Sequence, residues 1–158
     1  MKRMKLFLDT NVLIDYYAQR SPFFEDVAKI QIAQIMGDVE LWVAPHSLPD
    51  ASYILRKAVP APRLQEIMEN SLEFLTVSSG AQRETLLALS QRWDDFEDSF
   101  VHQCACRAGA DYIISRDEKG FARSSIPVLS PTAFLEFMEA EHGIVYEVFA
   151  SHVLPTAR

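Results

Sequence analysis

The chain has 158 residues, of which 49% are hydrophobic and 23% are charged, and its formal net charge is −7. This length suits one domain with a substantial core rather than two. No apolar run approaches the roughly 20 residues that span a bilayer, so we predict no membrane association. The acidic balance argues against a surface that coats nucleic acid, because such surfaces are usually basic. It is compatible with acids that converge on a metal ion.

Residues 1–17 combine a basic head with an apolar stretch, as secretory signal peptides do. However, Asp9, Asn11 and Asp15 interrupt the stretch, and no small-residue cleavage site follows it. We therefore predict that this segment contains an internal strand of a cytoplasmic protein.

Short β-rich runs alternate with longer helical runs, which predicts a parallel sheet covered by helices on both faces. Strands are expected at residues 5–8, 40–44, 73–77, 112–115 and 127–129, and helices at residues 12–19, 22–36, 48–58, 63–71, 81–90, 97–108 and 131–141. Ser21 is expected to cap the second helix, with Pro22 in its first position. The predicted fold class is α/β, a three-layer α/β/α sandwich with about five parallel strands. The domain is expected over residues 1–141, and the sequence does not place the tail at 142–158.

Ligands of an open parallel sheet bind beyond the carboxyl ends of its strands. The polar residues expected at this edge are Asp9, Thr10 and Asn11 after the first strand, residues 45–50 after the second, and residues 115–117 after the fourth. The helix before the fourth strand begins near Asp95 and Asp98. We therefore expect Asp9, Asp50 and Asp98 to approach one another, although they are far apart in sequence.

Hard divalent cations prefer oxygen ligands, and such a cation can activate water and offset charge on a phosphodiester. Two carboxylates about 5 Å apart repel by roughly 3 kcal/mol at an effective dielectric constant of 20. A cluster of three acids therefore needs a cation, or must keep one group protonated. The pattern predicts a Mg²⁺ or Mn²⁺ site.

Each acid also has a structural alternative. Ser47 and Asp50 match a capping box, and Asp95 and Asp98 have the same spacing at the start of a helix. Asp9 is harder to explain in this way, because Thr10 or Asn11 is expected to cap the helix that follows it. Asp15 either pairs on a helix face or extends the site. His46 either contacts substrate or is a surface or packing residue.

Several segments resemble the four motifs of PIN domains, in the right order over roughly residues 5–138. They are Leu8-Asp9-Thr10-Asn11-Val12-Leu13-Ile14-Asp15; Pro45-His46-Ser47-Leu48-Pro49-Asp50 continuing to Lys57; Asp95-Phe96-Glu97-Asp98-Ser99-Phe100 followed by Ala105; and Asp111-Tyr112-Ile113-Ile114-Ser115-Arg116-Asp117 with Phe121 and Ile126-Pro127-Val128-Leu129-Ser130-Pro131. The chain is similar to the VapC-type toxins of this family, which are metal-dependent ribonucleases often paired with an antitoxin that blocks the site.

The resemblance implies that Asp9, Asp50 and Asp98 are the catalytic, metal-binding acids, with Asp95 as a near neighbour. It also implies that Thr10 or Asn11 orients water or ligand. Arg116 is among the basic residues expected to meet RNA phosphates, with Arg56, Lys57, Lys119 and Arg123. The expected partners are an RNA substrate and an antitoxin, and a homodimer is a candidate assembly.

The chain departs from the family pattern at two positions. The second acid is more often Glu and here is Asp50, which is one methylene shorter. The fourth motif usually carries Asp directly before its Phe, where this chain has Gly120 before Phe121. Asp117 is the nearby acid expected to take that place at the metal.

Two other functions compete with that of an endoribonuclease. A degenerate PIN domain that binds RNA or protein with weak or no catalysis is favoured by Gly120 and by the acidic surface. A phospho-receiver or nucleotide binder is disfavoured. A phospho-receiver would need an acid at the end of the third strand, and residues 76–79 contain none. A nucleotide binder would need a Gly-rich loop after the first strand, and Asp9-Thr10-Asn11 contains no glycine.

Overall fold

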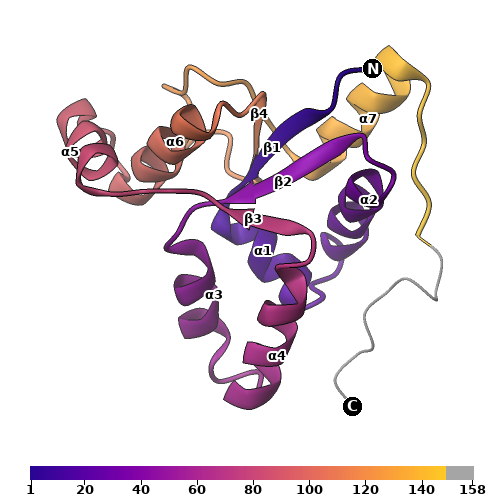
Figure 1. Ribbon diagram of the computed structural model, residues 1–158, viewed down its shortest axis with the longest axis horizontal. Coiled ribbons are helices and arrows are strands. Elements are labelled where there is room, and N and C mark those ends of the chain that lie inside the picture. The colour runs from indigo at the N-terminus through magenta and orange to yellow at the C-terminus, as the bar shows by residue number, and fades with distance from the viewer. Residues whose placement is uncertain (149–158) are drawn as a thin grey trace.

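The structure is a computed structural model that describes residues 1–148, and it contains a five-stranded parallel sheet in the order β3-β2-β1-β4-β5. The strands are β1 (Met4–Leu8), β2 (Val39–Val43), β3 (Leu75–Val77), β4 (Tyr112–Ile114) and β5 (Val128–Leu129). The predicted α/β class and the parallel five-stranded sheet are therefore confirmed. Figure 1 shows the sheet at the centre, with helices packed around it.

The helices follow the predicted order with small shifts at their ends. They are α1 (Thr10–Tyr17), α2 (Phe24–Ile35), α3 (Ser47–Leu55), α4 (Ala61–Ser71), α5 (Gln82–Gln91), α6 (Phe96–Ala108) and α7 (Pro131–His142). The predicted start of the second helix is wrong: residues 21–23 form a turn, and Phe23 is the N-cap residue without a side-chain hydrogen bond. Helix α4 begins two residues earlier than expected, because Pro62 lies in its first turn, where a proline costs no hydrogen bond.

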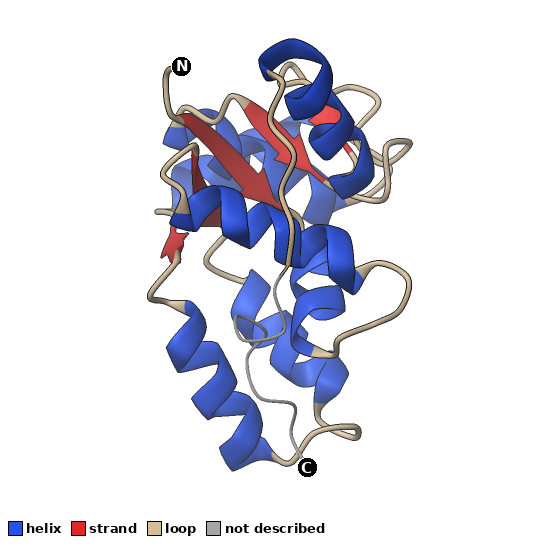
Figure 2. Ribbon diagram, turned by 90° about the vertical axis from the view of Figure 1, so that its right-hand side faces the viewer, coloured by secondary structure: helices blue, strands red, loops and turns tan. Residues whose placement is uncertain are grey.

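Alternate side chains of β1 serve two hydrophobic cores on opposite faces of the sheet. Leu6 and Leu8 belong to the larger core, which includes residues of α1, α2, α3, α4 and α7. Phe7 belongs to the smaller core on the other face, which includes Val101 and Ala105 of α6. Figure 2 shows helices on both sides of the strands, as the three-layer prediction requires, and α5 reaches the rest of the chain mainly through α6.

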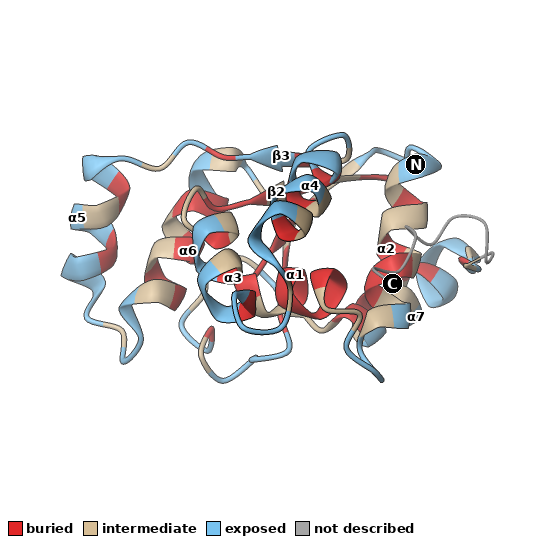
Figure 3. Cartoon of the chain, turned by 90° about the horizontal axis from the view of Figure 1, so that it is seen from below, coloured by how far each residue is buried: buried red, intermediate tan, exposed pale blue. Residues whose placement is uncertain are grey.

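Three neighbouring strands end at one level. Leu8 of β1 pairs with Val43 of β2 on one side and with Ile114 of β4 on the other. The chain starts in the middle of the sheet, adds β2 and β3 on one side, and then crosses to add β4 and β5 on the other. The boundary between β1 and β4 is thus a topological switch point, where α/β proteins bind their ligands. Figure 3 shows the buried residues concentrated on the strands and on the inner faces of the helices.

The segment that follows α7 packs back on the domain as far as it is described. Gly143 ends the helix in a left-handed conformation with φ 66°, and Ile144 then packs against the larger core. The Tyr146 side chain is 6% exposed, and its hydroxyl donates a 2.7 Å hydrogen bond to Asp38, just before β2. Residues up to 148 therefore adjoin the predicted domain, whereas the rest of the tail lies outside the described residues. No helix among the described residues has the length and apolarity needed to cross a membrane.

The contact between Tyr146 and Asp38 gives a prediction about stability. Tyr146→Phe removes the hydrogen bond and should lower the free energy of unfolding by about 1–2 kcal/mol. Tyr146→Ala also removes a buried ring and should cost about 3 kcal/mol or more. Val145 is 65% exposed, so Val145→Ala is a control expected to stay within about 0.5 kcal/mol of wild type. Urea denaturation measures all three, and equal stability of Tyr146→Ala and wild type would contradict this packing.

Candidate active site

Asp9 follows β1 directly and lies at the switch point. Its side chain is only 4% exposed. The expectation that Thr10 or Asn11 caps the next helix is wrong, because Asp9 itself is the N-cap residue and its Oδ1 accepts a 2.8 Å hydrogen bond from the Thr10 backbone N–H. Asp9 Oδ2 accepts a second hydrogen bond, of 2.8 Å, from the hydroxyl of Ser115. Both carboxylate oxygens are thereby held in one orientation.

Ser115 links the ends of β1 and β4. The residue is fully buried, and besides donating to Asp9 it accepts a 3.0 Å hydrogen bond from the backbone N–H of Asp117. Its hydroxyl also receives a longer contact, of 3.4 Å, from Asn11 Nδ2. Sequence reasoning missed this role of Ser115, although its position at the carboxyl end of a predicted strand was a usable signal.

The first turn of α6 brings two further acids to this edge. Asp95 is the N-cap residue, as its spacing predicted, and its Oδ1 accepts hydrogen bonds from the backbone N–H groups of Glu97 at 2.8 Å and Asp98 at 3.3 Å. This capping fixes the turn from which the Glu97 and Asp98 side chains extend. Asp98 is 6% exposed, whereas Asp95 is exposed.

Carboxylate oxygens of Asp9, Glu97 and Asp98 all lie within 4.8 Å of one another. Glu97 is the residue that sequence reasoning overlooked: it stands next to Asp98 in the third motif, from which only Asp95 and Asp98 were predicted to lie at the metal. Glu97 also belongs to a second group with His46 and Asp50, whose ligand atoms again lie within 4.8 Å of one another. The two groups adjoin through Glu97.

The acids line an open cleft of about 440 Å³. Thr10, Asn11, Asp50 and Asp117 line the same cleft, so the folded chain brings together most of the residues singled out from the sequence. Among the described residues, Asn11 Oδ1 is a buried oxygen without a hydrogen-bond partner. The polar groups that the cleft offers to a ligand are therefore mainly side-chain oxygen atoms.

Asp50 and His46 lie at the start of α3. The predicted capping box between Ser47 and Asp50 does not form, because His46 is the N-cap residue and the Ser47 hydroxyl lies 3.0 Å from that of Thr10. The Asp50 side chain is 51% exposed, and its carboxylate is 4.0 Å from His46 Nε2. His46 Nε2 makes its short contact, of 2.7 Å, with Glu97.

Crowding changes the ionisation of these acids. Burial, together with the charge of Glu97, raises the pKa of Asp9 to about 6. Burial, together with the charge of Asp9, raises the pKa of Asp98 to about 8. Burial also disfavours charge on Glu97, but the hydrogen bond and the charge of His46 outweigh it, so the pKa of Glu97 is lowered. A carboxyl that holds its proton near neutrality in an all-oxygen cluster is one that a divalent cation would deprotonate and bind.

Arg116 and Asp15 lie outside the cleft. The Arg116 guanidinium donates to both oxygens of Asp15, at 2.6 and 3.2 Å, and Asp15 is fully buried. The same guanidinium lies over the Phe23 ring at 4.0 Å from its centre. Asp15 therefore does not extend the acidic group, and Arg116 is engaged in a partly buried ion pair beside α2.

The sequence of residues 5–119 matches the family model of the PIN domain. The chain belongs to the PIN domain family. No curated protein sequence matches the chain significantly.

Solved structures share the PIN fold with this chain. VapBC2 of Rickettsia felis, solved with a DNA fragment from the promoter, aligns with a TM-score of 0.63 and 13% identity over 80% of this chain and 98% of that chain. VapBC-1 of nontypeable Haemophilus influenzae has a TM-score of 0.62 and 17% identity over 82% and 99%. VapC20 of Mycobacterium tuberculosis, a toxin that cleaves the sarcin–ricin loop, has a TM-score of 0.58 and 13% identity over 75% and 94%. At these identities the likeness is one of fold.

Gly120 stands where the PIN pattern usually has an acid, and the space beside it is occupied. A Cβ atom at residue 120 would lie 2.3 Å from Asp98 Oδ2 and 2.6 Å from Asp117 Oδ2. The Asp117 side chain also turns toward this backbone, since its Oδ1 accepts a 3.0 Å hydrogen bond from the Gly120 N–H. The Asp117 carboxylate thus lies where a side chain of residue 120 would begin.

The raised pKa of Asp98 predicts a pH-dependent stability of the metal-free protein. An Asp in the unfolded chain loses its proton near pH 4, whereas folded Asp98 keeps its proton up to about pH 8. Between these values the native state binds more protons than the unfolded state, so the free energy of unfolding falls as the pH rises. Urea denaturation in EDTA should show a steeper fall for wild type than for Asp98→Asn, and parallel pH profiles would contradict the assignment.

Proposed function

We propose that this PIN domain is a Mg²⁺- or Mn²⁺-dependent endoribonuclease that hydrolyses RNA phosphodiester bonds. The observation that carries the proposal is the convergence of Asp9, Glu97 and Asp98 within 4.8 Å at the carboxyl edge of the sheet. Two charged carboxylates at such a distance repel by about 3 kcal/mol. A fold that places three of them together, with hydrogen bonds to Asp9 and Glu97, is suited to a cation.

The donor set fits a hard divalent cation. Asp9, Glu97 and Asp98 would hold it, and Asp50 and Asp117 line the same cleft as further oxygen donors. When bound, the cation would supply Lewis acidity and offset negative charge on the phosphodiester. Both Mg²⁺ and Mn²⁺ take such oxygen ligands.

The surrounding residues position these acids. Ser115 and the Thr10 N–H hold the two oxygens of Asp9, and the Thr10 hydroxyl donates to Glu97 at 3.2 Å. His46 contacts the same Glu97 oxygen, so it orients that carboxylate and also offsets its charge. These hydrogen bonds fix the orientation of the Asp9 and Glu97 carboxylates.

A toxin–antitoxin pair is the setting that we propose for this activity, with the chain as a cytoplasmic toxin. Its support is the family membership and the likeness in fold to VapBC2 and VapBC-1. The open acidic cleft would then be the surface that an antitoxin blocks. Co-expression with the protein encoded next to this gene, followed by co-purification, tests the pairing.

Gly120 favours a second candidate function, a degenerate PIN domain that binds RNA or protein without efficient catalysis. Cleavage assays of mixed-sequence RNA with Mg²⁺ or Mn²⁺, and with EDTA as the control, separate the two. RNA binding without metal-dependent cleavage would favour the degenerate domain.

The endoribonuclease proposal predicts the effect of removing one charge from the acidic group. Asp98→Asn keeps the shape of the side chain but weakens the cation site, so RNA cleavage should fall by about 100-fold or more, since even groups that only orient metal ligands matter by 10–100-fold. Glu118→Gln makes the same charge change at an exposed residue outside this cluster and should keep wild-type activity. Equal losses in both variants would argue against a local role for Asp98.

Metal affinity of two variants tests whether Asp117 replaces the missing acid. If it does, Asp117→Asn should weaken Mn²⁺ binding by about 10-fold or more. Gly120→Asp should also weaken binding, because its Cβ would meet the Asp98 and Asp117 carboxylates at 2.3 and 2.6 Å. Titration calorimetry measures both. Tighter binding by Gly120→Asp would mean instead that the native site lacks one acid.

A further inference from the structure

Two large apolar side chains are exposed at the rim of the acidic cleft. Tyr53 is 66% exposed and Ile54 is 50% exposed, and both line the cleft together with Asp9 and Asp98. The opposite face of α3 supplies the packing of the helix, because Ala51 and Leu55 are buried there. The exposed pair is therefore not needed to attach α3 to the core. Adjacent exposed apolar side chains beside a polar cleft are typical of a binding surface.

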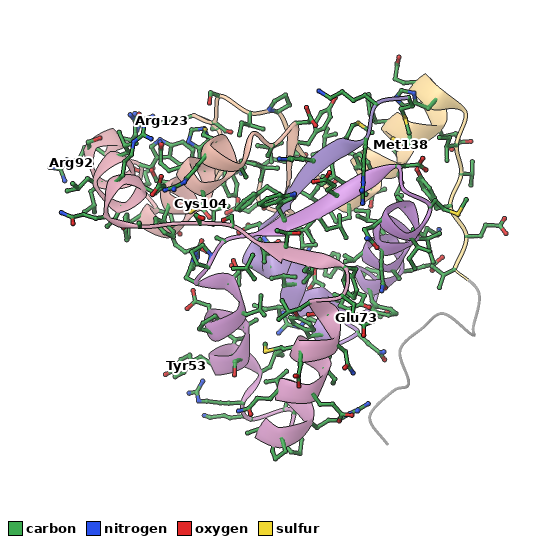
Figure 4. The ribbon with its side chains drawn as sticks, viewed as in Figure 1. Tyr53, Glu73, Arg92, Cys104, Arg123 and Met138 are labelled. Carbon is green, nitrogen blue, oxygen red and sulfur yellow. The ribbon has the colours of Figure 1, made fainter. Side chains whose placement is uncertain are left out.

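The positions of Tyr53 and Ile54 relative to Asp50 follow from helix geometry. They come three and four residues after Asp50, so they lie on the same side of α3, about one helical turn further along. Figure 4 shows Tyr53 projecting from α3 on the side away from α4. A ligand held at the acids would thus have an aromatic ring within reach along α3.

The Tyr53 ring is paired with a cation. The Arg56 guanidinium lies 3.7 Å from the centre of the ring, and it also donates a hydrogen bond to the Tyr53 carbonyl. This contact covers one face of the ring and supports its orientation. Lys57 is exposed next to Arg56, so the end of α3 is basic although the whole chain has a net charge of −7.

A ligand that uses all these features must combine an anionic group, which a cation at the acids would attract, with a flat ring beside it. A nucleotide has both. Bases inside a duplex are already stacked and paired, whereas bases of single-stranded RNA are free to stack on an aromatic side chain. The basic end of α3 suits a neighbouring phosphate of the same strand.

We propose that Tyr53, supported by Arg56 and flanked by Ile54, stacks on an unpaired base next to the phosphate that the acidic cluster cuts. This inference rests on the proposed endoribonuclease function. Tyr53 is then a specificity-determining residue, and it takes no part in holding the cation.

Three substitutions at Tyr53 separate stacking from a general apolar contact. Tyr53→Phe keeps the flat ring and should bind single-stranded RNA within about twofold of wild type. Tyr53→Leu keeps apolar area without a flat ring, and Tyr53→Ala removes both. Each of these two should weaken RNA binding by about 10-fold, because stacking one base on an aromatic ring has an effect of this size. Melting temperatures and Mn²⁺ affinity should not change, because the side chain is exposed and is not a ligand.

The probe is a mixed-sequence single-stranded RNA whose cut sites are mapped first with the wild-type protein. The base on either side of a mapped cut is then replaced by 2-aminopurine, whose fluorescence falls on stacking, or by an abasic nucleotide. In stopped-flow mixing with Mg²⁺, quenching should precede cleavage for wild type and Tyr53→Phe and be lost in Tyr53→Leu. The abasic RNA should bind wild type and Tyr53→Ala equally, and the same RNA annealed to its complement should be cut poorly.

The possible failures are distinguishable. If the wild type cuts RNA but Tyr53→Ala binds it as tightly, the stacking proposal is wrong and the proposed function stands. If Tyr53→Leu behaves like wild type, the contact is apolar and not stacking, which also overturns the proposal. If the wild type neither binds nor cuts single-stranded RNA with Mg²⁺, both the stacking role and the endoribonuclease function fail.

Discussion

Repulsion among carboxylates is the constraint around which this site is built. Asp9, Glu97 and Asp98 come from two distant segments, and moving their carboxylates apart into water would lower the free energy of the group. They are kept together because their backbones are fixed: Asp9 ends a central strand, and the other two lie in the first turn of α6 capped by Asp95. Hydrogen bonds from Ser115 and Thr10 then orient the side chains of Asp9 and Glu97. The fold therefore bears an electrostatic cost that a bound cation would relieve.

Within the protein itself, two features reduce that cost. One is His46, whose raised pKa and 2.7 Å contact with Glu97 place a partial positive charge against the group. The other is the proton on Asp98, retained to about pH 8 because burial and the Asp9 charge oppose ionisation. A divalent cation bound at these acids would displace the Asp98 proton, so metal binding would be coupled to the release of a proton.

Helix α3 combines a packing face with the face for which we propose base recognition. Its buried face joins α1 and α4 through Ala51 and Leu55, while its opposite face presents Asp50 and Tyr53 to the cleft. The packing face attaches the helix to the core, so its outward side chains lie beside the acids on β1 and α6. An acidic protein can in this way offer a local surface suited to a nucleotide. The acids would attract a phosphate through a bound cation, and an aromatic ring would stack on a base without any charge.

Local patterns in the sequence were enough to predict the strands and helices and the parallel sheet, and the resemblance of four motifs indicated the family. The strands and helices follow from periodicity and from turn residues, which are properties of neighbouring residues. The acids placed after strands made Asp9, Asp50 and Asp98 candidates, and their role stays a prediction. Tertiary structure alone decided which carboxylates lie close together at one point. It brought in Glu97, turned Asp117 toward Gly120, paired Arg116 with Asp15 and made Ser115 a support for Asp9. The reason is that side-chain direction at the start of a helix and the register between β1 and β4 depend on packing between segments about a hundred residues apart, and no local pattern records that distance.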